Sequence, residues 1–336
     1  MNNLPTGYTA RAATMDDVPA LADLINARTR RHSGRDGTTL GRLRGQFEFP
    51  GLDLEDGTRV VFAPDGALVA FGLVMDWTPP HVQLRALGPV HHDHLGRGIG
   101  TALEGWIEAR ARRAIDRAPD GARVVLHQSA FDVDRTAADF LAARGYAIVR
   151  HFWRMGIDLA APPPPPVWPD SVDVVRLNPQ VELRAAFEAI RGVFRDHWGF
   201  TDDASDEGFA QFHHQMETDP TFDPAFFTLV KDANGEIVAF CFGAPDLGTG
   251  EGLGLIQAVG VTRPWRRRGL ALALLHHTFG AFRRAGGTKA SLYVDAENLT
   301  GATRLYEKAG MHVTELSHEY EKELRAGADL TTRDSE

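Results

Sequence analysis

The sequence predicts an α+β (mixed α/β) protein made of two tandem copies of one fold. The chain has 336 residues, which corresponds to two domains at about 150 residues per domain. A run of five prolines, Pro162 to Pro166, interrupts the chain near its middle. The order of loop, helix, strand and helix before these prolines recurs after them. Duplication of one unit is the simplest explanation of this recurrence.

The second copy shows the element order most clearly. Asp232-Ala233-Asn234-Gly235 is typical of a hairpin turn between two alternating strands. Leu272, Leu275, Phe279 and Phe282 form one apolar stripe at helical spacing, and Gly286 follows as a C-terminal cap. The predicted elements are a helix over 183–194, strands over 226–230, 237–242 and 255–261, a helix over 271–285, a strand over 291–294 and a helix over 302–309.

The first copy repeats this order with similar signals. Asp65-Gly66 separates two apolar strand candidates, as a hairpin turn does. The predicted elements are a helix over 15–26, strands over 59–62 and 68–74, a glycine loop over 96–100 with a helix to 113, a strand over 124–126 and a helix over 137–144.

The proline run sets the predicted domain boundaries. Consecutive prolines donate no backbone hydrogen bonds and favour an extended helix, so they act as a stiff spacer. We therefore predict an N-terminal domain over 1–160, a linker over 161–169 and a C-terminal domain over 170–325. The small, polar residues over 326–336 predict a disordered tail.

The composition restricts the partners of the chain. Lys and Arg total 36 against 45 Asp and Glu, and the net charge of −9 disfavours nucleic acid or an anionic membrane as a partner. A single cysteine, Cys241, forms neither an internal disulfide nor a multi-cysteine metal site, and its apolar neighbours indicate a buried strand residue. No leader-like or membrane-spanning apolar run is present, so we expect a cytoplasmic protein.

The loop before the helix over 271–285 has the residues of a phosphate-binding site. Arg266, Arg267 and Arg268 precede Gly269, and Leu270 and Ala271 begin the helix. Unpaired amides and the dipole at a helix start attract anions, and small residues let them approach. The Walker sequence is missing, and a hairpin before the loop contradicts the Rossmann order. These residues indicate an anionic cofactor of another type.

Two motifs resemble the GCN5-related N-acetyltransferase (GNAT) family. Arg266-x-x-Gly269-x-Ala271 matches the signature of its cofactor loop, and Val294 to Asn298 followed by Ala302 to Met311 matches its next motif in order and spacing. The tandem layout is similar to mycothiol synthase and related actinobacterial two-domain acetyltransferases. The resemblance implies two GNAT-like domains, each a mostly antiparallel twisted sheet with a V-shaped splay between its fourth and fifth strands.

The resemblance also implies roles for individual residues. Acetyl-CoA would lie in the splay, with its diphosphate on the amides of residues 267–271 and its pantetheine arm along Val259, Gly260 and Val261. A backbone N–H near Val259 would polarise the thioester carbonyl, Tyr306 would protonate the departing thiolate, and Asn298 would contact the cofactor near its sulfur. No metal is implied.

The general base is not defined by the motifs. Gln257 occupies the position where many members carry a carboxylate, and an amide accepts no proton. His197 is a candidate because imidazole titrates near neutrality, with Trp198 as a wall of an amine pocket. Glu251 and a chain of water molecules are alternatives.

Each candidate also has a structural interpretation. Tyr306 shares a helical face with apolar residues, as a core aromatic does. Asn298 is suited to a helix N-cap, and His197 to a solvated helix end. The arginines of 266–268 would then be a solvated charge run.

The first copy lacks the matching residues. Leu95, Leu141 and Val133 align with Arg266, Tyr306 and Asn298. We therefore predict a degenerate domain with a structural or substrate-shaping role, and residual affinity for the cofactor stays open. His91-His92-Asp93-His94 places too many ligands in one short loop to surround an ion well, so we predict no metal there.

The predicted function is acetyl transfer from acetyl-CoA to a primary amine of a small metabolite by direct attack in the C-terminal domain. Asp196, Asp202 and Asp203 would attract a cationic acceptor. The alternatives are mycothiol synthase-like acetylation of a cysteinyl pseudodisaccharide and a non-catalytic acyl-CoA sensor or interaction protein. We expect a monomer or homodimer.

Overall fold

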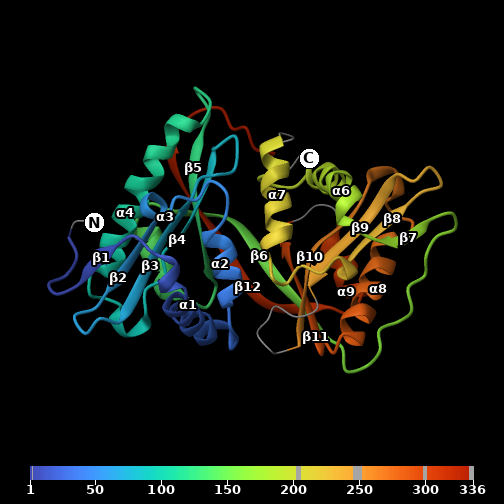
Figure 1. Cartoon of the computed structure of the whole chain (residues 1–336), viewed down its shortest axis with the longest axis horizontal. Coiled ribbons are helices and arrows are strands. Elements are labelled where there is room, and N and C mark those ends of the chain that lie inside the picture. The colour runs from blue at the N-terminus through green and yellow to red at the C-terminus, as the bar shows by residue number, and fades with distance from the viewer. Residues whose placement is uncertain (2, 202–205, 245–251, 298–300, 333–336) are drawn as a thin grey trace. The chain divides into compact units, whose positions relative to one another are not determined.

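The computed structural model describes residues 1, 3–201, 206–244, 252–297 and 301–332. The chain forms two compact units (Figure 1). The first unit comprises Met1–Arg150 and Ser317–Leu330, and the second comprises His151–Leu316 and the segment from Thr331. These units differ from the predicted ranges 1–160 and 170–325 at the last strand of each half.

The strands concerned are β6 (Ala147–Asp158) and β12 (His312–Arg325). From Phe152 onward β6 pairs antiparallel with β11 of the second unit, and from Ser317 onward β12 pairs antiparallel with β5 of the first unit. Each half of the sequence therefore supplies the other unit with its final strand. Such pairings join residues that are far apart in the chain, so the local periodicity of the sequence does not predict them.

The second unit has a mostly antiparallel sheet covered by helices. The order of its described strands is β7-β8-β9-β10-β11-β6, and among these only β10 and β11 pair in parallel. Its other strands are β7 (Asp173–Arg176), β8 (Phe227–Lys231), β9 (Ile237–Ala244), β10 (Leu253–Val261) and β11 (Lys289–Asp295). Its helices are α6 (Pro179–Phe194), α7 (Asp206–Thr218), α8 (Leu270–Arg284) and α9 (Ala302–Lys308).

The first unit repeats this topology, as the sequence predicts. Its strand order is β1-β2-β3-β4-β5-β12, and only β4 and β5 are parallel. Its other strands are β1 (Thr9–Arg11), β2 (Thr58–Phe62), β3 (Leu68–Met75), β4 (Gln83–Leu87) and β5 (Val124–Phe131). Its helices are α1 (Val18–Ser33), α2 (Leu40–Phe47), α3 (Leu54–Gly57), α4 (Ile99–Arg113) and α5 (Arg135–Ala143).

The parallel pair of the second unit separates part-way along its length. The pairing of β10 with β11 ends at Ile256 and Leu292, although the strands continue to Val261 and Asp295. An irregularity in β10 after Ile256 shifts its register with β9. A bulge of this kind bends a strand away from its neighbour. The V-shaped splay of the predicted fold is therefore confirmed.

Helix α8 covers the sheet of the second unit through the predicted apolar stripe. Leu275, Phe279 and Phe282 are fully buried, and Gly286 adopts a φ of 91° just beyond the helix end, as a C-terminal cap does. Leu272, the remaining member of the stripe, is only partly buried. It packs against the edge of the core and also lines the cleft described below.

The tail contains more order than its composition predicts. Ala328 exchanges backbone hydrogen bonds with Gly121 and Arg123, and Thr332 does so with Gly199 and Phe200. Residues 326–332 are thus held by main-chain pairing, which is independent of side-chain polarity. Residues 333–336 lie outside the described ranges.

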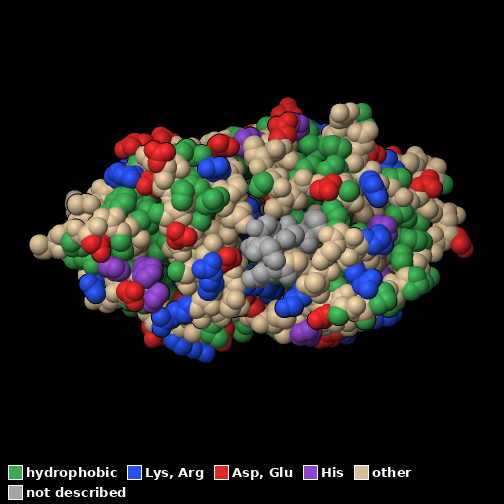
Figure 2. Space-filling model, turned by 60° about the horizontal axis from the view of Figure 1, so that its bottom comes forward, with side chains coloured by type: hydrophobic (Ala, Val, Ile, Leu, Met, Phe, Trp, Pro, Cys, Tyr) green, Lys and Arg blue, Asp and Glu red, His purple; other side chains and the backbone are tan. Residues whose placement is uncertain are grey.

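None of the described helices is long and apolar enough to cross a bilayer. On the face drawn in Figure 2, acidic and basic side chains are interspersed.

Candidate active site

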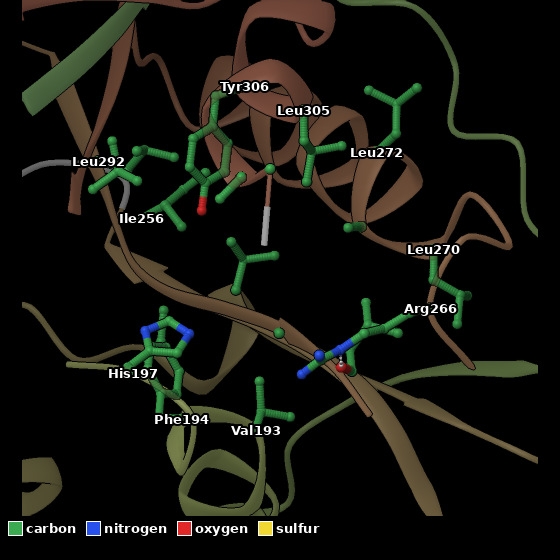
Figure 3. Close-up of a pocket in the computed structure, with 18 of the residues that line it drawn as sticks. Val193, Phe194, His197, Ile256, Arg266, Leu270, Leu272, Leu292, Leu305 and Tyr306 are labelled. Atoms are coloured by element: carbon green, nitrogen blue, oxygen red, sulfur yellow. Dashed lines mark hydrogen bonds between the residues drawn. The ribbon is translucent and has the colours of Figure 1, made fainter. Parts of the chain in front are cut away.

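The second unit contains a cleft of about 780 Å³ at the splay between β10 and β11. Its walls are β10, the start of α8, one face of α9 and the end of α6. Figure 3 shows Tyr306 and Leu305 on one side, with His197, Phe194 and Val193 on the opposite side. The cofactor loop, His197 and Tyr306, which the sequence analysis predicts as parts of the site, therefore line one cleft.

The phosphate loop forms a turn that presents backbone amides. Gly269 is the N-cap of α8 with a φ of 86°, and Arg267 also has a positive φ of 63°. A glycine adopts such values without steric cost, whereas an arginine seldom does. Leu270 and Ala271 follow directly and line the cleft. The first amides of α8 have no partner within the helix and are available to an anion.

The three arginines of the loop have different positions. Arg266 and Arg267 line the cleft. The Arg266 Nε donates a hydrogen bond to the carbonyl oxygen of Val261 at 3.2 Å. Arg268 is not among the lining residues, and its guanidinium lies over the ring of Trp265 at 4.7 Å. Arg268 therefore stabilises the turn by a cation–π contact.

The backbone of β10 has donors directed into the splay. Thr262 donates its N–H to Val238 of β9 at 2.9 Å. Because N–H groups alternate in direction along a strand, those of Val259 and Val261 point away from β9, toward the opening. Gly260 has a different function, since a Cβ there would lie 2.6 Å from Phe240 and 2.7 Å from Val193. Its glycine lets α6 pack against the strand.

Tyr306 lies on α9 with only 8% of its surface exposed. Its hydroxyl points into the cleft (Figure 3). Burial, with a smaller contribution from Cys241, raises the pKa of Tyr306 to about 12. The phenol therefore keeps its proton at neutral pH, as a proton donor must.

His197 lies just beyond the end of α6 and lines the cleft, with its ring 4.5 Å from that of Phe194. The neighbouring Asp196 accepts hydrogen bonds from the Arg263 guanidinium at 2.6 and 3.1 Å. This contact lowers the pKa of Asp196. Arg263 balances its charge, so Asp196 is bound within the loop and is not a free attractor of cations.

Several predicted residues are not described by the structure. Asn298, Asp202, Asp203 and Glu251 lie outside the described ranges. Gln257 lines the cleft, so β10 contributes an amide at this position.

Among the lining residues to which sequence reasoning gave no site role are Phe152 and Asp295. Phe152 reaches the cleft from β6, a strand of the other half of the sequence. Asp295 ends β11 beside the splay, and its Oδ1 accepts a hydrogen bond from the N–H of Glu297 at 2.9 Å. An acidic residue at the end of a parallel strand is a usable signal for Asp295. No local signal identifies Phe152.

In the first unit, His91, His92 and Asp93 place one ligand atom each within 4.8 Å of one another. His92 and Asp93 are exposed. The prediction that this loop holds no metal remains a prediction.

Comparison with known proteins agrees with the geometry of the cleft. Residues 187–311 match the acetyltransferase (GNAT) family model. A mycothiol acetyltransferase of Nocardiopsis dassonvillei is 32% identical over 247 residues, covering 66% of this chain and 69% of the relative.

Solved structures extend the similarity to nearly the whole chain. A GCN5-related N-acetyltransferase from Sphaerobacter thermophilus is 35% identical, with a TM-score of 0.80 over 98% of this chain and 100% of the other. A tandem GNAT protein from the clavulanic acid biosynthesis pathway has the same fold at 17% identity, with a TM-score of 0.70 over 94% and 98% of the chains. Taken with the cleft, these similarities show that the chain belongs to the GCN5-related N-acetyltransferase family and is an acyltransferase.

Proposed function

We propose that the second unit binds acetyl-CoA and transfers the acetyl group to a primary amine of a small metabolite. The observation that supports this proposal is that backbone N–H donors and one buried hydroxyl group face the same cleft. The N–H groups of Val259 and Val261 face the splay, Gly269 exposes the first amides of α8, and Tyr306 points into the same space.

The lining of the cleft fits a CoA thioester. The CoA diphosphate is an anion, which suits the amides of residues 267–271 and the charge of Arg266 and Arg267. The amide groups of the pantetheine arm suit pairing with Val259 and Val261 in the manner of an added strand. A volume of about 780 Å³ lies in the range of cofactor sites.

The transfer is a direct displacement. The amine nitrogen attacks the thioester carbonyl carbon, so that a C–N bond forms and the C–S bond breaks. A β10 N–H near Val259 polarises the carbonyl oxygen as negative charge develops on it. The departing sulfur takes the proton of the Tyr306 hydroxyl, the proton that the amine nitrogen loses passes to a base, and the Tyr306 phenolate regains a proton from solvent.

His197 is the base that we propose. Its imidazole lies across the cleft from Tyr306 (Figure 3), and Gln257 offers no proton acceptor. We expect His197→Gln to lower kcat/KM on the order of 100-fold and to remove the acidic limb of its pH profile. The control is His213→Gln on the exposed face of α7, which leaves the profile unchanged. An intact acidic limb in His197→Gln would assign the base to water.

The acceptor has a specific alternative. The similarity to a mycothiol acetyltransferase supports a cysteinyl pseudodisaccharide as the amine. The general proposal requires only a small primary amine that reaches the thioester between His197 and Tyr306.

A thiol-release assay tests the proposed function. Wild-type protein is incubated with acetyl-CoA and a panel of small primary amines that includes a cysteinyl pseudodisaccharide, and free CoA is measured. We expect amine-dependent release of CoA with an N-acetylated product identified by mass spectrometry. Tight binding of CoA without turnover on any amine would overturn the proposal.

A further inference from the structure

The first unit keeps the loop geometry of the second. Gly98 is the N-cap of α4 with φ 86° and ψ −7°, the same values as Gly269 at α8. Gly96 has a φ of 73° at the position of Arg267. The pairing of β4 with β5 ends at Arg85 and His127, while β5 continues to Phe131. Both the helix-start amides and the splay are therefore present in the first unit.

The two openings nevertheless differ greatly in volume. The cavity at the splay of the first unit is about 70 Å³, against about 780 Å³ in the second. A site of several hundred Å³ is needed to bury most of a cofactor-sized ligand. The first unit therefore has the same glycine loop as the second but lacks a cavity large enough for a cofactor.

Glu104 and Gln128 line the small cavity that remains, and Tyr146 does not line it but is hydrogen bonded to both of them. The Tyr146 hydroxyl donates to Glu104 Oε1 at 2.7 Å, and the Gln128 amide donates to Glu104 Oε2 at 2.8 Å and contacts the Tyr146 hydroxyl at 2.9 Å. All three are at most 9% exposed. We name Glu104, Gln128 and Tyr146 the polar cluster.

The equivalent positions of the second unit are apolar. Glu104 follows Gly98 at the same distance as Leu275 follows Gly269, and Tyr146 follows Gly145 as Met311 follows Gly310. Gln128 is three residues from the end of β5, as Leu292 is from the end of β11. Leu275, Leu292 and Met311 are at most 3% exposed and belong to the apolar core.

Separating the side chains of the polar cluster is energetically unfavourable. Its members hydrogen bond to one another, and separating them would leave buried polar groups without these partners, which is unfavourable. Burial raises the pKa of the Glu104 carboxyl, which is consistent with a site that excludes water. A ligand entering the splay must therefore disrupt this network.

We propose that the polar cluster closes the thioester end of the first splay, so that the chain binds a single acyl-CoA, in its second unit. This inference rests on the proposed function. The first unit then keeps the architecture of a cofactor site without the capacity to hold a CoA thioester.

Calorimetric titration with CoA tests the closure. Wild-type protein is expected to bind one CoA per chain, and Gly269→Glu, which weakens binding in the second unit on the order of 100-fold, is expected to show no binding at CoA concentrations that saturate wild-type protein. Replacing the polar cluster by its second-unit counterparts, as Glu104→Leu, Gln128→Leu and Tyr146→Met together, should open a further site. On the Gly269→Glu background, this triple variant should therefore bind one.

The outcomes separate the two proposals. Two sites in wild-type protein, or one remaining site in Gly269→Glu, would show an open first unit and overturn the closure. A triple variant that keeps a cooperative thermal transition but gains no site would do the same. No binding to wild-type protein would instead contradict the proposed function, and a site gained in the triple variant would still support the closure.

The buried carboxyl also has an effect on stability. Because the pKa of Glu104 is raised on folding, the folded state holds a proton that the unfolded state releases. The free energy of unfolding should therefore decrease as the pH rises above the ordinary pKa of glutamate. Glu104→Gln is expected to flatten this decrease in denaturant titrations between pH 4 and 7.

Glu108 is the matched control, one turn further along α4. It is partly buried, but Lys322 and Arg112 lower its pKa, so its linkage has the opposite sign. Glu108→Gln should remove a loss of stability at acidic pH and reduce the Glu104 effect only slightly, because burial is the largest cause of the raised Glu104 pKa and the charge of Glu108 the smallest. Equal pH dependence in wild type and Glu104→Gln would contradict a buried, proton-holding cluster.

Discussion

Replacing Tyr306 by phenylalanine is expected to lower turnover by about 100-fold or more while leaving CoA affinity nearly unchanged. The hydroxyl points into the cleft, and its pKa of about 12 keeps it protonated over the usable pH range. Removing a general acid costs roughly 100- to 10,000-fold in rate. The ring itself, buried at 8% exposure, keeps its packing in the variant. Steady-state kinetics and calorimetry with CoA separate these two quantities.

The control for this change is Tyr320→Phe, a buried tyrosine in the core of the first unit. This substitution likewise removes only a hydroxyl group from a buried tyrosine, and it should leave turnover unchanged. Turnover of Tyr306→Phe equal to that of wild type across the pH range would remove Tyr306 from the mechanism. Because burial raises the pKa of Tyr306 to about 12, we expect any basic limb of the wild-type profile near neutral pH to belong to another group.

Gly269→Glu is expected to weaken CoA binding on the order of 100-fold. A side chain at φ 86° strains the turn, and a carboxylate there repels the diphosphate that the α8 amides attract. A loss of about 2.8 kcal/mol corresponds to this factor. Space is not the cause, because no atom lies within 4 Å of a Cβ built at Gly269.

Gly98→Glu is a closely matched control. Gly98 has the same φ and ψ as Gly269 and also caps a helix of 15 residues, so the backbone strain is equal. We expect Gly98→Glu to keep CoA affinity and activity close to those of wild type. If the two variants lose activity equally, the loss in Gly269→Glu is a folding defect and not a binding defect. Thermal unfolding of both variants measures that defect directly.

The element order was predictable because its signals are local. The Asp232 to Gly235 turn, the apolar stripe of α8 and the cap at Gly286 each depend on a few neighbouring residues. The strand exchange of β6 and β12 was not predictable, since their partners lie far away in the sequence. The predicted ranges therefore differ from the two compact units over most of these two strands.

The site was predictable to a similar degree. Gly269 and Tyr306 follow from motifs, and both line the cleft. Arg268 and Asp196 were assigned by residue type, but Trp265 and Arg263 engage them. The partners of a charged side chain are a property of packing, which residue type does not specify.

The sequence by itself determined the duplicated α+β order, the glycine turn before α8 and the apolar face of that helix, because each arises from conformational preferences within a few residues. Only the tertiary structure decided which splay is open. Glu104, Gln128 and Tyr146 are separated along the chain and form a closed network only when α4, β5 and the start of β6 pack together. Hydrogen bonding between such distant groups depends on the folded geometry, which no local pattern encodes.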